Sequence, residues 1–122
     1  MLEQKELRNN STLRFPEDEI FRSLRAGDVE EFNRLLDDHD KLDLSECDLK
    51  GTDFRGIDFD RVILRGSYLR DTDLRGADLR NVDLEGCSIY HAKISGAYFP
   101  DNLPVEEIRM SIEYGTRLRV IR

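Results

Sequence analysis

The chain has 122 residues, room for one domain, and carries 26 acidic against 19 basic side chains, a net charge of −7. Only 39% of the residues are apolar, no run of about 18 apolar residues exists, and no basic segment precedes an apolar one as in a secretory signal. We therefore expect no membrane span and no secretory leader. Because phosphate binding needs positive potential, we also expect no direct nucleic-acid binding.

Residues 1–41 are expected to form an N-terminal tail and a helical cap. Residues 15–20 place acidic side chains where a helix N-terminus favours them, and Gly27 would end that helix. Asp28 can cap a second helix, with Glu31 at the spacing of a capping box. The second helix carries one apolar face, formed by Val29, Phe32, Leu35 and Leu36.

A five-residue period runs through residues 42–101. Every fifth residue from position 44 is large and apolar, and the residue two positions earlier is mostly small or β-branched. Asp often stands between the two, and glycine closes many units. We expect the large residues to form the core: Leu44, Leu49, Phe54, Phe59, Leu64, Leu69, Leu74, Leu79, Leu84, Ile89, Ile94 and Phe99.

Neither a helix nor a straight strand buries this pattern. Five residues advance a helix by about 500°, so successive large residues would scatter around its axis. In a strand, an odd period places successive large residues on opposite faces. A chain that turns a corner every five residues buries all of them, with the large and the small residue inside and the other three outside. Such short sides, stacked on one another, form a mainly β solenoid.

The units resemble the pentapeptide-repeat family, whose motif is roughly A-(D/N)-L-x-x. Residues 77–81 (ADLRN) and 82–86 (VDLEG) match it best. The resemblance implies a right-handed, quadrilateral parallel β-helix with four units per coil, hence about three coils over residues 42–101. The family is mainly bacterial, so the resemblance also implies a bacterial, cytoplasmic protein.

Four units per coil would stack residues that are twenty apart. Cys47, Ser67 and Cys87 then share a column of small, inward positions. A spacing of about 4.8 Å per coil separates the two cysteines by about 9.6 Å. A disulfide needs Cα atoms within about 7 Å. We therefore expect two free, buried thiols.

Residues 102–122 are expected to form a C-terminal helical cap and a basic tail. The helix would open at residues 102–104, with Pro104 in its first turn, and end at Gly115. The tail, residues 117–122, can be a short strand against the cap, a partner-binding arm or a frayed end, and a solvated, frayed end is the simplest reading. We expect residues 1–12 to be disordered or loosely helical.

The sequence favours a protein without catalytic residues, cofactor or metal. Its two histidines, His39 and His91, lie in different parts of the chain, and no HExxH, CxxC, GxSxG or phosphate-binding loop occurs. The aspartates follow the repeat and suit local backbone hydrogen bonds at turns better than a carboxylate or cation site.

Two sets of outward residues mark a candidate partner surface. The residue after the large position is arginine throughout the middle coil: Arg65, Arg70, Arg75 and Arg80. One side of the coil carries residue types that are enriched at interfaces: Tyr68, Arg70, Tyr90 and His91. A solvated ladder of Asp–Arg pairs and aromatic rings packed on their neighbours are the structural alternatives.

Two functions are compatible with these features. The residues favour a non-enzymatic interaction or scaffold module that presents rigid faces to an unidentified protein partner, with a homodimer through an end cap left open. The resemblance implies the alternative, because some members linked to quinolone resistance inhibit or protect DNA gyrase or topoisomerase by imitating duplex DNA. Short length and mixed surface charge disfavour this role: three coils span about 15 Å, whereas two turns of duplex span about 70 Å.

Overall fold

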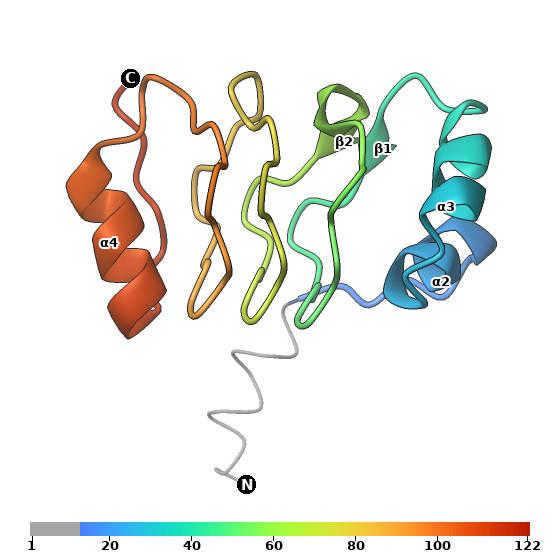
Figure 1. Cartoon of the computed structure of the whole chain (residues 1–122), viewed down its shortest axis with the longest axis horizontal. Coiled ribbons are helices and arrows are strands. Elements are labelled where there is room, and N and C mark those ends of the chain that lie inside the picture. Colours follow the sequence, from blue (N-terminus) through green and yellow to red (C-terminus); the bar gives the residue numbers. More distant parts are fainter. Residues whose placement is uncertain (1–12) are drawn as a thin grey trace, which may run out of the picture.

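The computed structural model describes residues 13–122, so the expectation for residues 1–12 lies outside the described residues. Two helices stand at one end of a stack of coils, and a third helix stands at the other end (Figure 1). Within residues 13–122 the elements are α2 (Glu19–Arg25), α3 (Val29–Leu36), β1 (Leu42–Asp43), the 3-10 turn η1 (Phe59–Arg61), β2 (Val62–Ile63) and α4 (Val105–Tyr114). None of the helices in this part of the chain is both long and apolar enough to cross a membrane.

Aspartates cap the first two helices. Asp18 accepts a hydrogen bond from the Phe21 amide at 3.1 Å, and Asp28 accepts one from the Glu31 amide at 3.1 Å. The predicted capping box is only half formed, because the Glu31 carboxylate pairs with Arg34 at 2.6 Å, one turn further on. The second helix therefore begins where the sequence indicates, after the Asp28 cap, whereas the first begins only at Glu19, because Asp18 is its N-cap and Glu17 precedes the helix.

The helix pair packs against the first coil. Asn33 of α3 donates a hydrogen bond to the Gly56 carbonyl at 3.2 Å. Val29 comes so close to Gly56 that a Cβ there would lie 3.2 Å from its methyl group. The buried side chains of the pair join the same apolar cluster as the coils: Ile20, Phe21, Leu24, Phe32 and Leu36.

The coils return to the same place every twenty residues. All bridges between them are parallel: Leu42–Val62, Asp43–Ile63, Asp48–Tyr68, Tyr68–Ser88, Asp53–Asp73, Asp73–Lys93 and Asp78–Tyr98. The glycines stack in the same register, since a Cβ on Gly86 would lie 3.4 Å from the Gly66 Cα. The columns expected from four units per coil are therefore present.

The large apolar positions fill the inside of the coils. Ten of the twelve are at most 4% exposed, from Leu44 to Ile89. Ile94 and Phe99, on the last two sides of the third coil, are only partly buried, which departs from the expectation that all twelve are enclosed. The cause is incomplete cover at this end of the stack, where no further coil follows.

The C-terminal helix begins slightly later than expected. Pro104 is its N-cap, with extended backbone at φ −63° and ψ 147°, and does not belong to the first turn. The end at Gly115 is confirmed, because this residue adopts the left-handed conformation at φ 77°. Ile108 and Ile112 pack against the core from α4.

The frayed-end reading of the tail is wrong. The Leu118 side chain is fully buried, its N–H donates to the Cys87 carbonyl at 2.8 Å, and its carbonyl accepts from the Gly86 amide at 2.8 Å. Ile121 also donates to the Asn102 carbonyl at 2.8 Å. The tail is an extended segment against the third coil, because the apolar interior and the unpaired edge of that coil need a cover.

Candidate functional site

The arginine–aromatic patch consists of Tyr68, Arg70, Tyr90 and His91 and lies on one side of the second and third coils. Tyr68 bridges Ser88 of the next coil, and Arg70 lies twenty residues before Tyr90. Coil stacking therefore brings together residues that are far apart in the chain.

Arg70 is held between two tyrosines. Its Nη1 donates to the Tyr68 hydroxyl at 2.9 Å, and its Cζ lies 4.7 Å from the centre of the Tyr90 ring. The bond to Tyr68 raises the pKa of Arg70, which keeps the guanidinium charged. His91 stacks on Tyr90 with ring centres 3.8 Å apart and 21° between the planes.

The patch also contains unusual backbone. Asp71 and His91, twenty residues apart, have φ values of 59° and 58°, in the left-handed region that favours glycine. Gly51 occupies the equivalent corner of the first coil, at φ 75°. Asp71 lies beside two members of the patch, 3.8 Å from Arg70 Nε and 3.9 Å from His91 Nδ1.

Helix α4 supports the patch from one side, which sequence reasoning did not foresee. A Cβ on Gly115 would lie 3.4 Å from the Tyr90 ring. Ser88 Oγ donates to the Gly115 carbonyl at 3.2 Å, and the His91 amide donates to the Ile112 carbonyl at 3.1 Å. Gly115 is favoured by its left-handed backbone at φ 77°, and a Cβ there would be in van der Waals contact with the ring, so the C-cap glycine is the signal that the sequence contained.

The other arginines of the middle coil form a ladder with aspartates. Arg75 and Arg80 each fork onto the aspartate two residues earlier, with closest Nη2–Oδ2 distances of 2.6 and 2.9 Å, and Arg65 pairs with Asp83 of the next coil at 2.9 Å. The fork lowers the pKa of Asp78 to about 2, chiefly through the Arg80 hydrogen bond. Arg70 differs, because within residues 13–122 its hydrogen-bond partner is a tyrosine hydroxyl, and its buried Nε has no hydrogen-bond partner there.

The comparison with family models identifies the repeat. The model described as Pentapeptide repeats (8 copies) matches residues 43–81 and 67–101. Over residues 43–101 the chain belongs to the pentapeptide-repeat family. A search of curated proteins and a search of solved structures each gave no match.

The inward cysteines of the pentapeptide repeat are structural. Cys47 and Cys87 are both free and buried, as expected from their column. Ser67 lies between them, with its Oγ 3.6 Å from the Cys87 Sγ. Burial raises the pKa of each thiol to about 11, which keeps both thiols protonated and unreactive at neutral pH.

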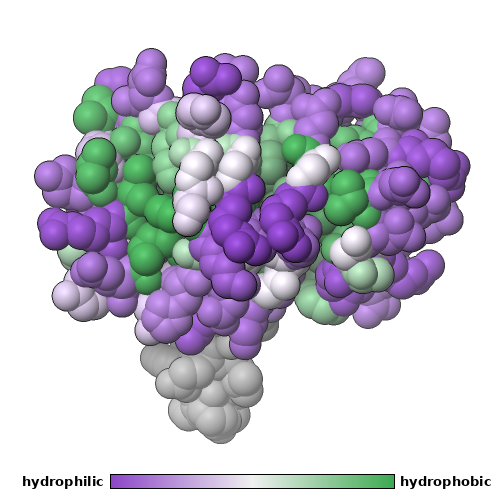
Figure 2. Space-filling model, in the orientation of Figure 1, coloured by the Kyte–Doolittle hydropathy of each residue, from purple (hydrophilic) through white to green (hydrophobic). Residues whose placement is uncertain are grey.

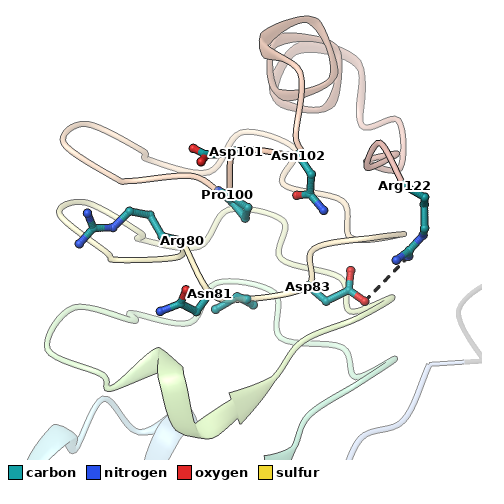
Figure 3. A pocket seen from close by; sticks show the side chains of 8 residues that line it. Arg80, Asn81, Asp83, Pro100, Asp101, Asn102 and Arg122 are labelled. Atoms are coloured by element: carbon teal, nitrogen blue, oxygen red, sulfur yellow. Dashed lines mark ion pairs between the residues drawn. The ribbon is translucent and has the colours of Figure 1, made fainter.

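An open hollow of about 720 Å³ lies where the second repeat coil meets the third (Figure 3). Asp83 and Arg122 face each other across part of it at 4.0 Å, whereas Arg80 points away from it. Its polar groups do not converge on one point, and in the described part of the chain no three His, Cys, Asp or Glu side chains are grouped to hold a metal. The arginine–aromatic patch is therefore the better candidate site.

Proposed function

We propose that this pentapeptide-repeat protein is a non-enzymatic interaction module that presents a rigid face to a protein partner in the bacterial cytoplasm. The face would be one side of a right-handed, four-sided parallel β-helix of three coils. Family membership and parallel bridges at every twentieth residue support that architecture. Flat sides with fixed columns of side chains suit docking better than enclosure of a small substrate.

Arg70 carries the proposal. Tyr68 and Tyr90 hold its guanidinium in place, while the side chain keeps 38% of its surface exposed. An arginine that is already ordered loses less conformational entropy on binding, and arginine beside tyrosine is a frequent composition of binding hot spots. We infer that the partner presents an acidic side chain, because a carboxylate matches the guanidinium with two hydrogen bonds.

Affinity purification from the source cells tests the proposal. We expect a partner to be captured by the natural protein and by Arg75→Ala, and to be lost with Arg70→Ala. Arg75 is the matched control, since it is an arginine of the same coil that its own Asp73 already engages. Tyr68→Phe removes only the hydroxyl that positions Arg70 and should weaken capture. If the natural protein and the three variants capture the partner equally well, the arginine–aromatic patch is not the binding surface.

A further inference from the structure

Half of the outer edge of the third coil has no backbone partner in residues 13–122. In the second coil, the amides of Leu74, Gly76 and Leu79 donate to third-coil carbonyls at 2.8 to 2.9 Å. Twenty residues later, the equivalent amides belong to Ile94, Gly96 and Phe99, and the described residues offer them no acceptor. The outward carbonyls of Ala92 and Ala97 likewise lack a donor in this part of the chain.

The other half of the same edge is closed by the chain itself. The tail pairs with Gly86 and Cys87 through Leu118, as described above. Ser111 Oγ of α4 accepts from the Ile89 amide at 2.9 Å. The edge of the third coil therefore already pairs with one extended segment, which carries a buried leucine.

Apolar side chains lie beneath the open half. In the columns below, Leu74 and Leu79 are at most 1% exposed, whereas Ile94 and Phe99 above them are only partly buried. The face shown in Figure 2 gathers hydrophobic residues around α4 and the neighbouring coil. An added strand would complete the burial of both side chains.

Lys93 provides a charge at the same place. It is exposed and makes no ion pair within residues 13–122, although it stacks on Asp73. Asp53 and Asp73 occupy its position in the two lower coils. An acidic residue at this position of an added strand would lie about 4.8 Å from Lys93 along the stack.

We propose that residues 92–99 bind an extended segment of another protein, which adds to the third coil as a parallel strand. The segment places an acidic residue beside Lys93 and large apolar residues over Ile94 and Phe99. Its backbone supplies the alternating donors and acceptors that the edge lacks, the mode of strand addition. This site is distinct from the arginine–aromatic patch, and either can fail without the other.

A ten-residue peptide with the sequence of residues 72–81 is a suitable probe. Stacked in register, it places Asp over Lys93 and leucines over Ile94 and Phe99. NMR titration of the whole protein should shift the amides of Ile94, Gly96 and Phe99 and slow their hydrogen exchange. The amides of Gly86 and His91, which already have partners, should not change. A peptide with lysine in place of both leucines is the control and should not bind.

A charge exchange tests the predicted register. Lys93→Glu should weaken binding of the peptide by about twofold to fivefold, as expected for one cross-strand pair. Replacing the peptide's first aspartate by lysine should restore the affinity for this variant. Lys50→Glu, an exposed lysine of the first coil, is the matched control and should bind as the natural protein does.

Two results would overturn the proposal. One is the absence of shifts at Ile94, Gly96 and Phe99 at millimolar peptide. The other is protection of these amides in the free protein together with a mass that doubles with concentration. In that case a second copy of the chain covers the edge, and no foreign segment does.

Discussion

Individual residues at the corners of the coils show where the repeat is strained. Glycine takes six of the nine left-handed corners, but Glu46 takes one at φ 54° in the first coil. Gly66 and Gly86 occupy the same column in the next two coils. A side chain with Cβ is disfavoured there by about 1 kcal/mol, and glutamate lacks the local hydrogen bonding that helps Asp and Asn.

Glu46→Gly should therefore stabilise the protein by less than about 1 kcal/mol, because the added freedom of the unfolded chain offsets part of the relieved strain. Urea unfolding of the variant and the natural protein measures the difference. Glu30→Gly is the control, because the same exchange inside helix α3 should destabilise by about 0.5–1 kcal/mol. A loss of stability with Glu46→Gly would show that the corner is not strained.

The aspartates of the ladder predict how stability depends on acid. The folded chain lowers the pKa of Asp78 from 3.8 to about 2, first through the side-chain hydrogen bond of Arg80. A carboxylate whose pKa is lower in the folded chain stabilises the fold above its ordinary pKa. That contribution is lost as the pH falls through the folded value. Asp73 follows the same direction because of its hydrogen bond with Arg75.

We expect the free energy of unfolding to decline between pH 4 and pH 2, and to decline less steeply in Asp78→Asn, because the titrating carboxylate is gone. The asparagine variant should be less stable than the natural protein at pH 7. Urea unfolding at several pH values measures both effects. If the free energy of unfolding falls equally steeply with pH in the two proteins, the Asp78–Arg80 pair does not have the assigned role.

At the scale of elements, each coil is stabilised by the coil above and below it. The apolar column Phe54, Leu74 and Ile94 shows this, because Leu74 is enclosed from both sides whereas Ile94 is covered incompletely. Hydrophobic stabilisation grows with the area removed from water, so equal truncations along one column should have unequal costs.

Leu74→Ala should lower the free energy of unfolding by about 2–5 kcal/mol, the usual range for a buried leucine. Ile94→Ala should cost about half as much, since part of its side chain already contacts water. Urea unfolding of both variants tests the ranking. A larger loss for Ile94→Ala would mean that the end of the stack is covered in solution.

The tail is the second element whose contribution can be measured. Leu118→Ala should destabilise by about 2–4 kcal/mol, because its side chain is buried above the third coil. Arg119→Ala, next to it and exposed, should change stability by less than about 0.5–1 kcal/mol despite its ion pair with Glu107. If Leu118→Ala unfolds at the same temperature as the natural protein, the tail does not pack against the third coil in solution.

The whole molecule combines a net charge of −7 with a surface on which many carboxylates already have arginine partners. A mimic of duplex DNA needs a long row of carboxylates without such partners. The stack of coils over residues 42–101 is also short, at about 15 Å by the strand spacing. Charge and length together therefore favour the interaction module over the gyrase-binding alternative.

We expect the purified protein not to inhibit DNA supercoiling by gyrase at micromolar concentration, since it lacks an extended negative surface. The supercoiling assay measures this directly. Inhibition that disappears when the charges of Asp58 and Asp78 are reversed would favour the DNA-mimic role instead.

Much of the repeat follows from local sequence. The period of five and the inward positions depend on which side chains can be buried at a corner, and every unit has the same pattern. The stacking of residues twenty apart was implied only by the family resemblance, and the parallel bridges confirm it. The helix caps at Asp28 and Gly115 are equally local, since each is decided within one turn.

The cover that the tail gives to the C-terminal end of the stack was decided only by tertiary structure. Nothing in residues 117–122 distinguishes a docked strand from a solvated tail, because the partner of Leu118 is a coil edge some thirty residues away. The position of Arg70 between two tyrosines depends likewise on Tyr90, which only coil stacking brings to it. The sequence by itself determined the repeating core, whereas contacts between distant segments decided which edge is covered and which arginine packs between two tyrosines.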